Sequence, residues 1–158
     1  MESGRSVDAL YIDFSRAIDS LNHSLLVEKL KKYGVPTESL QWFSSYLSGR
    51  SLQVRVDYNL STVFSAMFGV PQGSHLRPIL FLIYVQDLTA GLNVNHSMYA
   101  DDLKLSWKMN GLADHQRLQR CLDQVARWGI LDDFGLNPLI SQAITFSRRR
   151  SHILHRAY

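Results

Sequence analysis

The sequence predicts an α+β fold, because segments of two different periodicities follow one another along the chain. Short segments alternate apolar and polar residues, as strands with one buried face do, and longer segments place apolar residues three or four positions apart, as amphipathic helices do. The chain has 158 residues, of which 46% are hydrophobic and 20% charged. That length suits one compact domain, which would bury roughly 70% of its unfolded surface.

The chain opens with an expected strand and an expected helix. In residues 10–14 every second side chain is apolar, so a strand would bury those side chains and turn Asp13 to the opposite face. Asn22 precedes a run with apolar residues at helical spacing, and Gly34 ends that run. We interpret Asn22 as a helix cap rather than as a chemical group.

A second helix and a two-stranded ribbon are expected next. Thr37 is suited to cap the helix, because its hydroxyl can accept a hydrogen bond from a free backbone N–H group, and Gly49 closes the helix. Residues 52–56 alternate again, and residues 62–68 are rich in strand formers. The two segments would therefore pair through a turn at residues 58–61.

The remaining elements are a buried helix, a hairpin, a long helix and a last strand. The proline that opens residues 78–88 suits a first helical turn, and the apolar run that follows predicts a buried helix. A strand over 97–102 ends at two aspartates, and 103–107 would pair back on it. Apolar spacing around 118–125 predicts a long amphipathic helix. Residues 143–147 are expected to form a final strand.

Composition excludes several classes of protein. The net charge of +3 and the pI near 9.1 reflect a basic cluster at Arg148, Arg149 and Arg150, which suits a nucleic-acid partner but also suits a solvated tail. The single cysteine, Cys121, excludes an internal disulfide and a multi-cysteine zinc site. The longest apolar run, 79–85, is too short to span a bilayer, so we expect a soluble protein with no membrane partner.

Three short motifs carry the candidate chemistry. Asp13 stands in an apolar strand, Asp101 and Asp102 follow Tyr99-Ala100 at the end of another, and the loop at 69–74 reads Gly-Val-Pro-Gln-Gly-Ser. A carboxylate at the edge of an apolar stretch is costly unless a cation or hydrogen bonds compensate its charge. Three such carboxylates brought together would hold two divalent ions. Each motif alone is weak, since paired aspartates usually form turns or caps.

In this order the motifs resemble the reverse transcriptase of non-LTR retrotransposons of the LINE type, similar to Jockey. The first family motif is recognisable at 11–23, the second at 69–81 and the third at 99–102, and the similarity extends through 46–50 and 135–147. The resemblance implies a polymerase palm, that is, an antiparallel sheet backed by helices. The chain over 1–158 would be a truncated reverse transcriptase domain that lacks most of the fingers and the thumb.

The resemblance also implies an RNA-directed DNA polymerase, with an RNA template, a DNA primer and dNTPs, working in the nucleus or cytoplasm. Two Mg²⁺ or Mn²⁺ ions would be held by the catalytic residues Asp13, Asp101 and Asp102. By matching position, the nucleotide-binding residues would be Phe14, through its main-chain carbonyl, Ile18, Gln72, Gly73 and Tyr99.

Three departures from the family pattern predict weak activity or none. Ile18 stands where the family has Phe or Tyr under the nucleotide sugar, and Arg77 stands where it has glycine, which we expect to disturb the start of a helix. No lysine remains between Asn137 and Phe146, although the family uses one there as a proton donor. Loss of a general acid commonly lowers a rate by about 10²–10⁴. A second polypeptide supplying fingers and thumb is a candidate partner.

Other functions remain open at this point. The chain could be a non-catalytic nucleic-acid-binding remnant that uses Arg148, Arg149 and Arg150, or the functionless product of a decayed element. An RNA-dependent RNA polymerase is disfavoured, because Tyr99-Ala100 precedes the aspartates where those enzymes usually have glycine.

Overall fold

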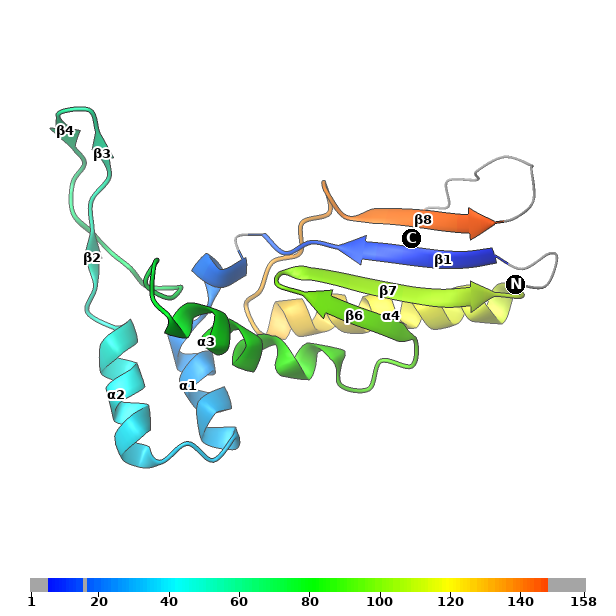
Figure 1. The fold of residues 1–158 in the computed structure, drawn as a ribbon, viewed down its shortest axis with the longest axis horizontal. Helices are drawn as coiled ribbons and strands as arrows, with labels where there is room; N and C mark the ends of the chain where they lie inside the picture. The colour runs from blue at the N-terminus through cyan, green and yellow to red at the C-terminus, as the bar shows by residue number, and fades with distance from the viewer. Residues whose placement is uncertain (1–5, 16, 148–158) are drawn as a thin grey trace. The chain divides into compact units, whose positions relative to one another are not determined.

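The structure, a computed structural model, describes residues 6–15 and 17–147, which divide between two compact units (Figure 1). Unit 1 combines the chain up to Ala17 with everything from Gln86 onward, and unit 2 is the segment Ile18–Val85. The α+β class is confirmed, with an antiparallel sheet and four α-helices among the described residues. No helix in these ranges is both long enough and apolar enough to cross a membrane. The basic cluster at 148–150 lies outside the described residues.

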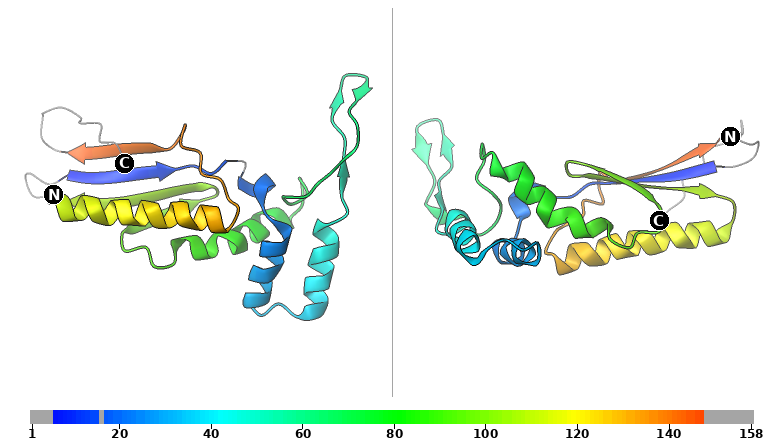
Figure 2. Two further views of the ribbon diagram at one scale, coloured as in Figure 1. Left: turned by 180° about the vertical axis from the view of Figure 1, so that it is seen from behind. Right: turned by 60° about the horizontal axis from the view of Figure 1, so that its bottom comes forward.

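Unit 1 is a four-stranded antiparallel sheet with one long helix across one face (Figure 2). The strand order is β6-β7-β1-β8, so the first strand of the chain lies between two strands from its second half. The elements are β1 (Ser6–Ile12), the 3-10 helix η2 (Gln86–Thr89), β6 (Asn95–Tyr99), β7 (Asp102–Met109), α4 (Leu112–Leu131) and β8 (Gln142–Ser147).

The two faces of this sheet differ, as the alternation in the sequence predicts. Leu10 and Ile12 of β1 are each 4% exposed, and they pair with equally buried leucines of β7. Full burial of such a side chain contributes roughly 1.5–3 kcal/mol. Tyr11 points to the other face, where it is 37% exposed and the Lys104 ammonium lies 5.2 Å from the centre of its ring. The helix α4 covers the apolar face, through Leu118, Cys121 and Val125.

Unit 2 is a helical group with a narrow ribbon. The helix α1 packs against both α2 and α3. The ribbon consists of two short ladders, β2 with β5 and β3 with β4. The elements are η1 (Ala17–Ser20, whose first residue belongs to unit 1), α1 (His23–Lys32), α2 (Thr37–Leu47), β2 (Ser51–Leu52), β3 (Arg55–Val56), β4 (Asn59–Leu60), β5 (Phe64–Ser65) and α3 (Leu76–Val85).

Of the two predicted helix caps, the one at the start of α1 is confirmed and the one at the start of α2 is not. Asn22 caps α1 as predicted, because its Oδ1 accepts the N–H groups of Ser24 at 3.0 Å and Leu25 at 3.3 Å. The prediction for Thr37 is wrong, since Pro36 occupies the capping position and Thr37 is already helical. Proline has a fixed φ and needs no backbone donor there, so the helix begins without a side-chain cap.

Two other boundaries also differ from the prediction. The ribbon turns at Asp57-Tyr58 rather than at 58–61, and Asp57 adopts φ 52°, a left-handed conformation that aspartate tolerates better than most residues. The helix α3 begins at Leu76, before Pro78, because the Ser74 hydroxyl accepts the Leu76 N–H at 3.1 Å. Pro78 still lies in the first turn, where a helix leaves its N–H groups unpaired.

A cluster of three aromatic rings joins the end of α4 to the residues that follow β1. The Phe14 ring lies 5.0 Å from Phe134 and 6.4 Å from Trp128, measured between ring centres. The chain reverses tightly after α4, since the Phe134 N–H donates to the Gly129 carbonyl at 2.7 Å. A Cβ atom at Gly129 would lie 2.7 Å from the Phe134 carbonyl oxygen, so the reversal needs glycine at this position.

Gly129→Ala is therefore expected to destabilise the protein, although alanine is normally preferred over glycine inside a helix. The clash involves backbone, which cannot rotate away, and we expect a loss of about 1–3 kcal/mol in the free energy of unfolding. Chemical denaturation would measure it. Gly135→Ala is the matched control, because its Cβ would meet only the Ser15 side chain at 3.7 Å. Equal stabilities of the two variants would contradict the prediction.

Candidate active site

The three candidate catalytic carboxylates all belong to unit 1 and gather at one end of its sheet. Asp13 follows the last residue of β1, Asp101 lies in the β6–β7 loop and Asp102 begins β7. The register pairs Ile12 with Leu103, and the same register continued by one residue sets Asp13 opposite Asp102. Both carboxylates therefore belong to the face of the sheet that points away from α4.

The hairpin that presents Asp101 has the shortest common loop. Tyr99 pairs with Asp102, so only Ala100 and Asp101 lie between the strands. Ala100 has φ 51°, whereas Asp101 has no positive φ, which is the φ pattern of a type II′ turn. Glycine is usual at the first of these positions, and a residue with a Cβ atom costs about 1–3 kcal/mol of strain there. The loop holds Asp101 half-buried at the sheet end.

The carboxylates repel one another. Partial burial, followed by the negative charges of Asp101 and Asp102, raises the pKa of Asp13 above its ordinary value. A hydrogen bond from the Asn137 side chain acts in the opposite direction and lowers that pKa. The charges of Asp101 and Asp102 thus act on Asp13, although the three residues come from segments almost ninety residues apart in the sequence.

The donor chemistry of this set fits a divalent cation. Carboxylate oxygens are the ligands that Mg²⁺ and Mn²⁺ prefer, and a cation would offset both the burial and the neighbouring charges that raise the pKa of Asp13. In the described ranges no three His, Cys, Asp or Glu side chains are gathered tightly enough to form a ready-made ligand shell. The residues fit a metal by their chemistry and charge, while the compact ligand arrangement is not preformed.

Two residues of the segment after α4 contact Asp13, and the sequence analysis did not find them. The main-chain N–H of Asn137 donates to the Asp13 carbonyl at 2.9 Å, and the Asp13 N–H donates to the Ser141 hydroxyl at 3.3 Å. The Asn-Pro pair at 137–138 signals a turn in the sequence. Nothing local, however, indicates which strand the turn contacts.

The other predicted nucleotide-binding residues are divided between the units. In unit 1, Tyr99 is 84% exposed, whereas Phe14 as a whole is only 2% exposed and its ring lies in the aromatic cluster. In unit 2, Ile18 is half-buried in η1, and Gln72 and Gly73 are exposed in the loop before α3. The structure thus brings Phe14 and Tyr99 together with the carboxylates in one unit.

Within unit 2, the segment that carries Ile18 contacts the chain on both sides of the loop at residues 69–74, through Gly69 at its start and Arg77 in the first turn of α3. A Cβ atom at Gly69 would lie 2.8 Å from the Asp19 carbonyl oxygen, and Gly69 has φ 73°, so glycine is required on both counts. Arg77 does not disrupt the start of α3, contrary to our expectation. Its Nη2 lies 2.8 Å from Asp19 Oδ1, an ion pair that accommodates the long side chain.

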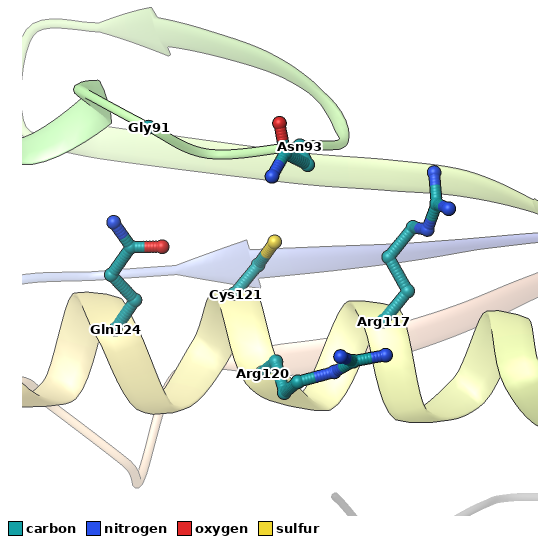
Figure 3. A pocket seen from close by; sticks show the side chains of 6 residues that line it. All are labelled: Gly91, Asn93, Arg117, Arg120, Cys121 and Gln124. Carbon is teal, nitrogen blue, oxygen red and sulfur yellow. The ribbon is translucent and has the colours of Figure 1, made fainter.

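A cavity of about 600 Å³ lies on the α4 side of unit 1, where α4 passes the segment before β6. Figure 3 shows the side chains of Arg117 and Arg120 toward one end of it and Gln124 toward the other. The Arg117 guanidinium lies 4.8 Å from the centre of the Trp107 ring, which fixes its position. The lining residues that the structure describes include two arginines and no acid, a composition that suits an anion. Sequence analysis missed these arginines because isolated charges on a helix are usually solvated.

Comparison with known proteins gives consistent results. The family described as "Reverse transcriptase (RNA-dependent DNA polymerase)" matches residues 2–141. A probable RNA-directed DNA polymerase from transposon BS of Drosophila melanogaster is 35% identical over 133 residues, which are 77% of this chain and 14% of that protein. The RNA-directed DNA polymerase from mobile element jockey of the same species is 28% identical over 158 residues, 94% of this chain and 17% of that protein.

A solved structure shares the fold. Apo telomerase from Candida tropicalis, truncated from its C-terminal domain, superimposes with a TM-score of 0.63 over 94% of this chain and 32% of that one, at 13% identity. At this identity the likeness shows the fold alone. The chain spans about 14–17% of the length of the curated relatives named above.

Asp13→Asn is expected to stabilise the metal-free protein near neutral pH, because it removes a charge from the repelling set while an amide oxygen can still accept the Asn137 hydrogen bond. The raised pKa means that ionisation of Asp13 disfavours folding above that pKa and has no effect below the unfolded value of about 3.8. We expect a gain of less than about 1 kcal/mol at pH 7.5, since the group is partly solvated, and a smaller gain as the pH falls toward 4.

Thermal unfolding at several pH values in the presence of a chelator would measure this gain. Asp57→Asn in the ribbon is the control, because Asp57 stands in a left-handed conformation that asparagine also tolerates. A gain for Asp13→Asn that does not depend on pH would show that the ionisation of Asp13, disfavoured by burial and by the neighbouring charges, is not its cause.

Proposed function

This chain belongs to the reverse transcriptase (RNA-dependent DNA polymerase) family, and we propose on that basis that its two units are parts of one domain, over 1–158, that copies RNA into DNA. The observation that supports this proposal is the convergence of Asp13, Asp101 and Asp102 at one end of the sheet in unit 1. The family works on a nucleic-acid template and primer with dNTPs as substrates. Relatives from mobile elements carry the same activity in their names.

In this proposal Asp13, Asp101 and Asp102 hold two Mg²⁺ or Mn²⁺ ions. Such a pair, when bound, activates the primer 3′-hydroxyl and neutralises the charge that develops on the triphosphate. The chain's own residues position the reactants. The main-chain carbonyl next to Asp13, from Ile12 or Phe14, adds a neutral oxygen ligand, and the exposed Tyr99 ring supports the primer terminus.

The loop at Gln72-Gly73 is proposed to lie along the incoming nucleotide. Gly73 has φ 78° and open space where a Cβ atom would stand, so its backbone can approach a ligand closely. Gln72 is exposed and supplies a polar side chain. Ile18 takes the position under the sugar, where it presents less area than the aromatic ring of the family pattern.

We propose that the chain by itself is weakly active or inactive. The residues between Asn137 and Phe146 include no lysine, and Ile140 there is 55% exposed and has no proton to donate. A missing general acid alone accounts for a loss of about 10²–10⁴ in rate. The relatives are about six to seven times longer than the matched part, and we propose that parts equivalent to their remainder grip template and primer.

Divalent metal binding tests the proposed site directly. Asp101→Asn is expected to weaken Mn²⁺ binding at least about tenfold, because it removes one of three charged ligands. Calorimetry on the folded protein, with a primer–template and a dNTP present, would measure it. Asp57→Asn is the matched control, since it removes an aspartate charge in unit 2, whereas the catalytic set belongs to unit 1. Absence of specific Mn²⁺ binding by the folded wild-type chain would contradict the proposal.

Primer extension on an RNA template then separates weak activity from none. The wild-type chain is expected to extend a primer only when it is mixed with a polypeptide that supplies the remaining parts of such a polymerase. Asp101→Asn should abolish that extension.

A second candidate function is nucleic-acid binding without catalysis, and the cavity with Arg117 and Arg120 favours it. Two exposed arginines beside a hollow whose described lining residues include no acid suit the phosphates of a nucleic-acid backbone. In this function the arginines at 148–150 would raise the affinity further by pairing with additional phosphates.

The double variant Arg117→Gln/Arg120→Gln is expected to weaken nucleic-acid binding and to reduce the slope of log K against log salt by about one to two, because each arginine that pairs with a phosphate releases about one counterion. Titration of a fluorescent oligonucleotide at several salt concentrations would measure both quantities. Arg55→Gln/Arg127→Gln removes the same charge outside the cavity and is the control. Identical slopes for the two double variants would exclude a role for the cavity.

A further inference from the structure

The segment after α4 pairs with the chain around Asp13 in a register different from that of β8. In the β1–β8 ladder Tyr11 pairs with Gln142, and this register continued would set Phe14 opposite Leu139. Phe14 instead bridges to Leu136, a shift of three residues. The extra residues form a turn, residues 137–141, that projects from the pairing beside Asp13.

This turn is closed by its own hydrogen bonds. The Ser141 N–H donates to the Asn137 carbonyl at 3.1 Å, and the Ser141 hydroxyl donates to the same oxygen at 2.8 Å. The Leu139 N–H donates to Asn137 Oδ1 at 3.3 Å, which makes an Asx turn. Because Oδ1 is used inside the turn, the amide of Asn137 is oriented with Nδ2 free to donate elsewhere.

Two main-chain hydrogen bonds then join the turn to Asp13. The Asn137 N–H donates to the Asp13 carbonyl at 2.9 Å, and the Asp13 N–H donates to the Ser141 hydroxyl at 3.3 Å. The Asn137 side chain also acts on the carboxyl group, since it lowers the pKa of Asp13. The turn thus holds the main chain on both sides of the Asp13 Cα atom and influences the carboxylate between them.

Packing alone does not hold this turn. Leu139 is 92% exposed and Ile140 is 55% exposed, so neither is an apolar anchor. A cavity of about 320 Å³ lies beside it, lined in part by Tyr11, Pro138 and Ser141. The hydrogen bonds are therefore the main constraint on the position of Asp13 relative to this segment.

We propose that Asn137 and Ser141 are positioning residues that hold Asp13, main chain and carboxylate together, in the orientation of a metal ligand. The inference rests on the proposed function in so far as Asp13 binds a metal. Outer partners that orient a ligand typically change metal affinity by about 10–100-fold when they are removed. Ser141 has a second task, since its hydroxyl accepts from Asp13 and donates to Asn137, and so connects the two.

Two measurements on the same four variants test the proposal. Amide exchange of Asp13 is measured without metal, by NMR, and Mn²⁺ affinity is measured by calorimetry. Ser141→Ala and Asn137→Ala should accelerate Asp13 exchange by about three- to tenfold, since each hydrogen bond contributes modestly. Both should weaken Mn²⁺ binding by about tenfold or more. Ser141→Thr keeps the hydroxyl and should restore both values.

The matched control is Ser97→Ala, which removes an exposed hydroxyl from β6 and should change neither quantity. Variants that lower the melting temperature but leave exchange at Asp13 and Mn²⁺ affinity within twofold of wild type would overturn the proposal, because the turn would then be merely structural. If wild type binds no Mn²⁺, the proposed metal site fails, and the exchange measurement alone decides whether the turn positions Asp13.

Discussion

The apolar face between the sheet and α4 is the constraint on which unit 1 depends, because it holds the strands in register against like-charge repulsion at one end of the sheet. Asp13 and Asp102 are set opposite each other by the register of β1 and β7, and opposed like charges destabilise an antiparallel pair. The register is nevertheless secure, because a slip by one residue would exchange Leu10 and Ile12 for charged or polar neighbours against α4. The apolar face thus fixes the arrangement that the opposite face disfavours.

The same logic extends to the segment that follows α4. Phe134 packs on Phe14 and closes the chain onto Gly129, so the aromatic cluster sets where this segment runs. Its backbone then pairs with residues 13–15, since the Ser15 N–H donates to the Gly135 carbonyl at 2.8 Å. Apolar contacts provide the stability, and the hydrogen bonds beyond them provide the orientation. A carboxylate in a repelling set needs both, because repulsion alone would move it toward solvent.

Periodicity in the sequence predicts the order and type of nearly every element, because alternation and helical spacing are local properties. The sequence also predicted that Asp13 and the paired aspartates would be brought together, since each stands at the end of a strand-like segment in a recognisable motif. The contacts of Asn137 and Ser141 were not, because Ser141 meets Asp13 across 128 residues of sequence and through a register shift that no local pattern encodes. The capping role expected of Thr37 failed for the opposite reason, since a single neighbouring proline outweighs a side-chain preference.

Departures from the family pattern differ in whether neighbouring residues can compensate for them. Arg77 replaces a glycine at a helix start, yet Asp19 lies within 2.8 Å of its guanidinium and the helix forms. An ion pair with a neighbouring residue can thus accommodate a larger side chain at this position. The stretch Leu139-Ile140-Ser141-Gln142, by contrast, contains no lysine where the family pattern has them, and no arrangement of neighbours gives an alkyl group a proton to donate. Under the proposed function, the fold would therefore keep the carboxylates in place while the missing general acid slows the transfer itself, so geometry and activity require separate measurements.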